Sequence, residues 1–125
     1  MALGGGKSLI DYKLYCVNGT PVFIQVMANR VANTHKVDIS LFDTDWISHP
    51  EYCRSLHKQA ENIEKPISFE KMVEMAKSLS KPFPFVRVDF YEINGKPILG
   101  EMTFTPGFDS INNKFEQLIG EMIQL

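Results

Sequence analysis

Hydrophobic and polar positions alternate along the first part of the chain, which is the pattern of β-strands with one buried face. Residues 12–17 and 22–27 are rich in β-branched and aromatic side chains, and Asn18-Gly19 lies between them. Asn-Gly between two such runs is the strongest short-range signal for a β-hairpin. The sequence therefore predicts an antiparallel strand pair here, followed by a further strand near residues 37–42.

A helical pattern replaces this alternation at residues 68–81. Apolar side chains recur there at spacings of three and four, which places them on one face of an α-helix. Ser68 suits the N-cap position, and Pro82 and Pro84 end the helix. The buried face is predicted to carry Phe69, Met72, Val73, Ala76 and Leu79.

A second hairpin and a final helix follow. Residues 85–91 and 97–105 read as strands around Asn94-Gly95. Asp109 or Ser110 then caps a helix, because apolar residues return at helical spacing after them. One side of this helix is predicted to carry Ile111, Phe115, Leu118, Ile119 and Met122.

The order of these elements predicts the fold class. Residues 46–66 have no clear period and read as a long loop with one helical turn. The predicted fold is α+β: a mainly antiparallel sheet, built from two hairpins, with helices packed on one face. We expect residues 1–8 to be a disordered, Gly-rich N-terminus and residues 9–125 to form a single domain.

The register of the second hairpin decides which side chains share a face. A two-residue loop would pair Ile93 with Lys96 and separate Asp89 from Glu101. A three-residue loop, with Gly95 in a left-handed conformation, would instead gather apolar residues on one face. Each large apolar side chain buried this way contributes about 1.5–3 kcal/mol, so we expect the three-residue loop. The apolar face would carry Val86, Val88, Phe90, Ile98, Gly100, Met102 and Phe104.

The register of the first hairpin can be predicted by the same argument from burial. A three-residue loop is again expected, because it separates apolar from polar side chains. Its core side would carry Tyr12, Leu14, Cys16, Val22, Ile24 and Val26. Its other side would carry Asp11, Lys13, Tyr15 and Gln25, with Phe23 as an apolar exception.

The polar face of the second hairpin is the candidate site of chemistry. In the expected register, Glu101 lies opposite Arg87 and diagonal to Asp89. One interpretation is a solvated face with a surface ion pair, worth about 0–1 kcal/mol. The other is a divalent-cation site, because Mg²⁺ prefers one or two carboxylates with water and phosphate completing its shell. Spacing alone leaves both open. The full face is Arg87, Asp89, Tyr91, Leu99, Glu101, Thr103 and Thr105.

Composition narrows the class of protein. The chain has 125 residues, with 13 Lys and Arg against 15 Asp and Glu, so its net charge of −2 argues against a general nucleic-acid binder. No apolar run approaches the ~18 residues that a transmembrane segment needs. The first ten residues lack the apolar stretch of a signal peptide. With only two cysteines, a reduced, cytoplasmic setting is expected.

Several motifs, in order along the chain, resemble a known enzyme family. The motifs RVDF (87–90), NGK (94–96) and GEMTFTPG (100–107) resemble the metal-binding hairpin of ATP-grasp enzymes. Together with DYKLYCVNG (11–19), HK (35–36) and FPFVRVD (83–89), they make residues 9–125 similar to the TupA-like ATP-grasp family. That resemblance implies a link to cell-surface polysaccharide or teichuronopeptide biosynthesis. Members of the family are often labelled glycosyltransferases, but no nucleotide-sugar acid pair is evident in this sequence.

The resemblance implies roles on the second hairpin. Asp89 and Glu101 match the carboxylates that hold Mg²⁺ between the phosphates of ATP. Thr103 stands where many ATP-grasp enzymes have Asn as a further metal ligand. Arg87 matches an Arg that steadies the reacting acyl phosphate.

The resemblance also implies nucleotide contacts elsewhere. Asp11 matches an acidic residue that accepts the ribose hydroxyls, and Lys13 points to the same side, toward phosphate. Lys36, together with Arg30, lies where a phosphate-contacting Lys is expected. The implied reaction is ATP-dependent ligation of a carboxylate to an amine through an acyl phosphate.

The extent of the resemblance sets a further expectation. ATP-grasp enzymes hold ATP between two lobes, and this chain resembles the second of them; the lobe with the Gly-rich lid would lie before residue 1. We therefore expect the isolated chain to bind Mg-ATP weakly and to turn over negligibly. The alternative is a non-catalytic module that self-associates or binds a partner, because a missing lobe would expose apolar surface.

Overall fold

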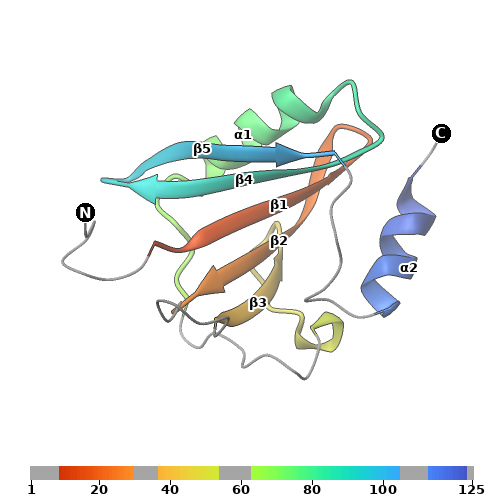
Figure 1. The fold of residues 1–125 in the computed structure, drawn as a ribbon, viewed down its shortest axis with the longest axis horizontal. Coiled ribbons are helices and arrows are strands. Elements are labelled where there is room, and N and C mark those ends of the chain that lie inside the picture. Colours follow the sequence, from red (N-terminus) through yellow and green to blue (C-terminus); the bar gives the residue numbers. More distant parts are fainter. Residues whose placement is uncertain (1–8, 30–36, 54–62, 105–112, 124–125) are drawn as a thin grey trace.

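A computed structural model of the chain describes residues 9–29, 37–53, 63–104 and 113–123 (Figure 1). Within these residues, five antiparallel strands form one sheet in the order β3-β2-β1-β4-β5. The strands are β1 (Asp11–Val17), β2 (Thr20–Ala28), β3 (Asp38–Asp43), β4 (Phe85–Ile93) and β5 (Lys96–Thr103). The helices are α1 (Phe69–Ser80), α2 (Asn113–Met122) and the short 3-10 helix η1 (Pro50–Tyr52).

The α+β class and the predicted elements are confirmed, but the helices do not share a face of the sheet. Leu14 and Cys16 pack into a cluster with α1, whereas Tyr15 and Val17 pack with Phe115 of α2. Successive side chains of a strand point to opposite faces, so the two helices cover opposite faces. The prediction of one helical face was wrong because Tyr15, Val17, Phe23 and Leu41 make one end of the polar face apolar enough to bury.

Both hairpins turn through two residues, not through the three that we expected. Val17 pairs with Thr20, and Ile93 pairs with Lys96. The turn residues are left-handed, with φ of 51° and 81° at Asn18-Gly19 and 53° and 73° at Asn94-Gly95. Turns of this kind match the twist of the flanking strands, which favours them over the longer loop.

A bulge in each hairpin corrects the register beyond the turn. In the second hairpin Phe90 pairs with Leu99 but Asp89 pairs with Glu101, which leaves Gly100 as the extra residue. Between the turn and the bulge, the two-residue turn exchanges the faces of two residues relative to the prediction: Leu99 lies on the side of Phe90, and Ile98 lies on the side of Tyr91. Both are 43% exposed.

The bulge of the first hairpin has a similar effect. Tyr15 pairs with Phe23 and Cys16 with Pro21, so Val22 is the extra residue. Val22 packs on the α2 side, and not on the predicted core side. The remaining residues predicted for the core side are confirmed there, namely Tyr12, Leu14, Cys16, Ile24 and Val26.

Ser68 precedes α1, as predicted, but its hydroxyl does not cap the helix. Its hydroxyl and its backbone amide both donate to Glu92 Oε2, each at 2.7 Å. The carboxylate of β4 thus binds the amide at the start of α1 and ties the helix to the sheet. The predicted cap of the final helix, Asp109 or Ser110, and the Pro106-Gly107 turn lie outside the described residues. None of the helices among the described residues is long and apolar enough to cross a membrane.

Candidate functional site

The candidate site lies on three neighbouring strands of the sheet, β1, β4 and β5. Asp89 of β4 pairs with Lys13 of β1 on one side and with Glu101 of β5 on the other. Two residues further along the strands, Arg87 lies between Tyr15 and Thr103. The residues of each row lie directly opposite one another, so their side chains share one face of the sheet.

Asp89 is at the centre of this arrangement and is only 5% exposed. Its Oδ2 accepts hydrogen bonds from Lys13 Nζ and Arg87 Nη2, each at 3.0 Å, and its Oδ1 accepts one from Arg87 Nε at 2.9 Å. A buried carboxylate is costly unless it is paired, and hydrogen bonds to charged donors are the strongest available. Lys13 and Arg87 together compensate the buried charge.

Arg87 links the carboxylate to the edge strand. Its Nη2 donates to Thr103 Oγ1 at 3.4 Å and lies 3.9 Å from Glu101 Oε1. Burial alone would lower the pKa of the guanidinium, but the hydrogen bonds and the charge of Asp89 outweigh it and raise the pKa above its usual value. Arg87 is therefore a fixed positive charge.

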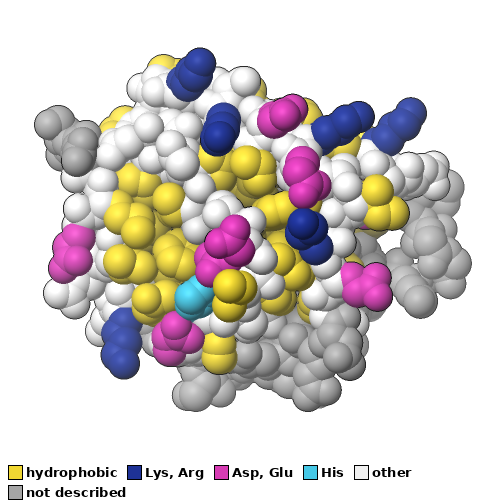
Figure 2. Space-filling view, turned by 180° about the vertical axis from the view of Figure 1, so that it is seen from behind, with side chains coloured by type: hydrophobic (Ala, Val, Ile, Leu, Met, Phe, Trp, Pro, Cys, Tyr) yellow, Lys and Arg dark blue, Asp and Glu magenta, His cyan; other side chains and the backbone are white. Residues whose placement is uncertain are grey.

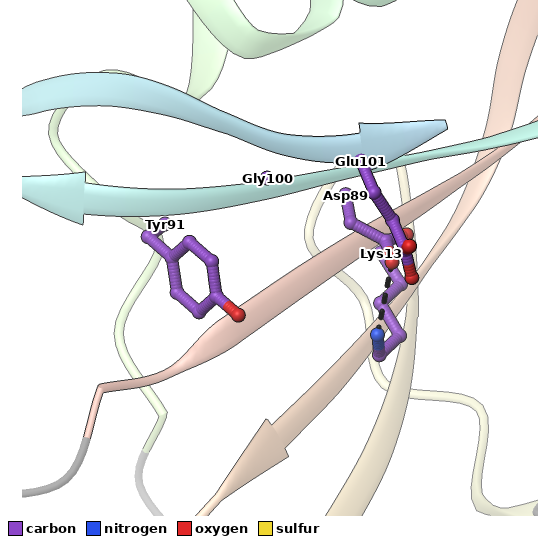
Figure 3. A pocket seen from close by; sticks show the side chains of 5 residues that line it. All are labelled: Lys13, Asp89, Tyr91, Gly100 and Glu101. Carbon is purple, nitrogen blue, oxygen red and sulfur yellow. Dashed lines mark hydrogen bonds and ion pairs between the residues drawn. The ribbon is translucent and has the colours of Figure 1, made fainter. Parts of the chain in front are cut away.

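A pocket of about 300 Å³ opens beside Asp89 (Figure 3). It is lined by Lys13, Asp89, Tyr91, Gly100 and Glu101. Figure 3 shows the charged groups together on one side and the Tyr91 ring on the other, with its hydroxyl end toward the space between them. The Glu101 side chain is 67% exposed, so this carboxylate is open to solvent.

The Tyr91 ring is positioned by the bulge. A Cβ on Gly100 would lie 3.0 Å from Tyr91 Cε2 and 3.4 Å from Asp89 O, so glycine permits this close approach. Tyr91 and Gly100 belonged to the predicted hairpin faces, but sequence reasoning gave them no role in the site. A glycine in the middle of a strand is a signal for a bulge and could have indicated this.

The donor set is compatible with a magnesium ion that arrives with phosphate. A carboxylate offers roughly four acceptor positions, so Asp89 retains capacity beyond its three hydrogen bonds, and Glu101 is open to solvent. Among the described residues no three His, Cys, Asp or Glu side chains converge to enclose an ion. Two carboxylates completed by water and phosphate are the usual set for Mg²⁺.

The predicted site residues are mostly brought together. Five of them, Lys13, Arg87, Asp89, Glu101 and Thr103, form the two rows described above. The predicted pairing of Glu101 with Arg87 was wrong, because the bulge places Glu101 opposite Asp89 and Thr103 opposite Arg87. Asp11 is on β1 two residues before Lys13, hence on the same face, but it is buried and does not line the pocket.

Two of the predicted nucleotide contacts, Lys36 and Arg30, lie outside the described residues.

A comparison with protein families finds a match over residues 4–124, nearly the whole chain, to a family described as TupA-like ATPgrasp. Comparison with curated proteins and with solved structures finds no match.

Proposed function

We propose a function from one premise: the chain belongs to the TupA-like ATP-grasp family. We infer that the shared face of β1, β4 and β5 binds Mg-ATP for the ligation of a carboxylate to an amine. The observation that carries the proposal is the direct pairing of Asp89 with Glu101 beside a pocket that Lys13 also lines. We also propose a cytoplasmic location, because ATP is available there. The proposed biological role is in cell-surface polysaccharide or teichuronopeptide biosynthesis.

The proposed roles follow from the chemistry of each side chain. Asp89 and Glu101 would hold Mg²⁺, with the Thr103 hydroxyl as a further oxygen ligand. When bound, the ion would neutralise phosphate charge and align the groups for transfer. Lys13 would contact phosphate, and Asp11 would accept the ribose hydroxyls. Lys36 remains a predicted phosphate contact.

Arg87 has the part closest to the chemistry. In the proposed reaction a substrate carboxylate oxygen attacks the γ-phosphorus of ATP, and ADP leaves. An amine then attacks the acyl carbon, phosphate leaves, and the amine nitrogen loses a proton to solvent. The oxygens of the transferring phosphoryl group carry negative charge in the first step, and the acyl oxygen gains negative charge in the second. A guanidinium that Asp89 already orients, at 2.9 and 3.0 Å, stabilises that charge without reorganising.

Glu101 offers the test, because its exposed side chain contributes little to folding. We expect the chain to bind Mg-ATP with an affinity weaker than micromolar, since an open face contacts one side of the nucleotide only. Glu101→Gln should weaken binding by roughly tenfold, as expected for the loss of a charge beside a cation. Isothermal titration with Mg-ATP measures both.

The matched control is Glu74→Gln, which removes an exposed carboxylate from α1 on the other face of the sheet. It should bind Mg-ATP like the original chain. Equal binding by both variants and the original chain would remove the basis of the proposal.

A second candidate is an interaction module, favoured by the apolar surface of the chain. Figure 2 shows apolar side chains gathered on the face seen from behind, among charged ones. Ile98 and Leu99 are also exposed on β5, which is an edge strand of the sheet that the described residues form, and an edge strand can pair with another chain. In this case sedimentation would show concentration-dependent association of the chain with itself, and Mg-ATP would not bind.

A further inference from the structure

We propose that Lys13 is a positioning residue that competes with a divalent cation for Asp89 and releases it only when phosphate is present. The proposal rests on the function proposed above and concerns the order in which that site is filled. Metal and nucleotide would bind together, and metal alone would bind poorly.

The first ground is that the charge of Asp89 is already compensated without a metal. Lys13 Nζ is 3.0 Å from Asp89 Oδ2, and the two side chains are only 14% and 7% exposed. An ion pair at this depth is screened much less by salt and water than a surface pair. A cation that approaches Asp89 must therefore overcome the positive charge of Lys13.

The second ground is that the two basic partners of Asp89 differ. Arg87 contacts both carboxylate oxygens through Nε and Nη2, whereas Lys13 contacts one. A planar guanidinium bound through two atoms is held more firmly than an ammonium on a flexible stem. Arg87 also has Thr103 as a partner, so Lys13 is the basic group free to exchange.

The third ground is the position of Lys13 in the pocket, which it lines together with Asp89 and Glu101. Phosphate groups in this pocket would offer Lys13 a new anionic partner as the cation takes its place beside Asp89. Charge stays balanced in this exchange, whereas a bare cation would leave the Lys13 ammonium buried without a counter-charge, which is costly.

Manganese is the probe, because it broadens the NMR signals of nearby amides, here those of Gly100 and Glu101. The original chain is titrated with Mn²⁺ alone and with Mn²⁺ plus ATP, and the titrations are repeated on Lys13→Met. Removing the competing charge should tighten the binding of Mn²⁺ alone by roughly tenfold, the usual effect of one charge at this distance. Binding of Mn²⁺ with ATP should weaken, because the phosphate contact is lost.

A merely structural role of Lys13 would not tighten the binding of Mn²⁺ alone while weakening the binding of Mn²⁺ with ATP. Lys77→Met, on the exposed side of α1, is the matched control and should change neither affinity. Lys13→Gln keeps a hydrogen-bond donor beside Asp89 without the charge, and it replaces Lys13→Met if that variant fails to fold. Equal weakening of both affinities, or no change in either, would overturn the proposal for Lys13 and leave the proposed function standing. Failure of the original chain to show broadening at these amides with Mn²⁺ and ATP would overturn both.

Discussion

At the scale of single residues, the site depends on one buried carboxylate and its two basic partners. Arg87 supplies two of the three hydrogen bonds to Asp89, and both side chains are largely removed from solvent. Taking away one partner of a buried ion pair leaves the other charge uncompensated, and this costs more than the intact pair contributes. The same contacts that prepare Asp89 for ligand chemistry are therefore needed for folding.

Arg87→Met should accordingly lower the free energy of unfolding by about 3 kcal/mol, because Asp89 keeps only Lys13 as a basic partner. Urea denaturation measures the change. Lys65→Met is the control: it breaks an exposed pair, Lys65 with Glu70 at 3.2 Å, and should leave the midpoint unchanged. Similar midpoints for both variants would show that the Arg87–Asp89 pair contributes no more than a surface contact.

The sequence was sufficient to predict some residues of this site, but not all of their contacts. RVDF and GEMTFTPG identified Arg87, Asp89 and Glu101, whose residue types already suggest a cation site. The place of Lys13 opposite Asp89 depends on β1 pairing with β4, two strands far apart in the chain. Alternation within a strand predicts a face, but not which strand lies beside it, so this contact was not predictable.

At the scale of elements, the second hairpin has both the two-residue turn and the apolar face that the sequence analysis treated as alternatives. Asn-Gly favours a two-residue turn, and burial favours the apolar register; one extra residue in β5 satisfies both. The positions of the strands were predictable because their composition is local. The bulge was not, because its benefit appears only when turn and face are weighed together.

The close approach of Gly100 and Tyr91 can be tested by adding one methyl group. Gly100→Ala places a Cβ 3.0 Å from the Tyr91 ring, so the ring must shift. We expect a loss of stability of about 1 kcal/mol and a change in the NMR signals of the Tyr91 ring. In Tyr91→Ala the same substitution should cost clearly less. Equal costs in the two backgrounds would place the strain elsewhere.

The junction of β3 and η1 gives a prediction for pH. His49 Nε2 is 2.8 Å from Asp43 Oδ2, and Nδ1 is 2.9 Å from Glu51 Oε2. The hydrogen bonds that the His49 ring donates to Asp43, and then to Glu51, raise the pKa of His49 above its ordinary 6.5. Burial alone would raise the pKa of Asp43, but the hydrogen bonds it accepts from His49, Ile47 and Asp45 lower it. The pKa of Glu51 is lowered first by His49, with Lys114 as a further positive charge nearby.

The directions of these pKa shifts determine how the stability of the fold changes with pH. A raised pKa in the folded state means that the His49 contacts stabilise fully below pH 6.5 and are lost as the pH rises through the raised value. The contributions of Asp43 and Glu51 are present above their ordinary values and are lost as the pH falls through the lowered ones. The melting temperature should therefore fall from pH 6 to pH 9, and it should fall less in His49→Gln. Parallel curves would contradict the assignment.

At the scale of the whole molecule, one sheet separates two clusters of buried side chains. Phe115 of α2 packs edge-on against Tyr15 and Phe23, with ring centroids 5.3 and 5.1 Å apart. The single tryptophan, Trp46, lies on the other side, stacked on Phe42 at 4.2 Å. Because the clusters share their strands, we expect them to unfold together.

Phe115→Ala tests this coupling across the sheet. The loss of a fully buried ring should lower stability by about 3–5 kcal/mol. The fluorescence of Trp46, on the far side, should report the lower midpoint in urea. Glu116→Ala, an exposed neighbour on α2, should leave that midpoint in place. A Trp46 transition that Phe115→Ala does not move would mean that the two clusters unfold independently.

The extra residue in β5 separates two properties of the site that otherwise vary together. If Gly100 were deleted, Asp89 would still pair with Glu101, because the register set by the turn would then run without a shift from Ile93–Lys96 to this pair. Keeping Gly100 but flattening the bulge would instead turn the same acid toward the α1 side. Both changes remove the bend that the bulge gives the strand. Only the loss of one residue preserves the acidic pair, whereas straightening the strand at its full length separates the two carboxylates.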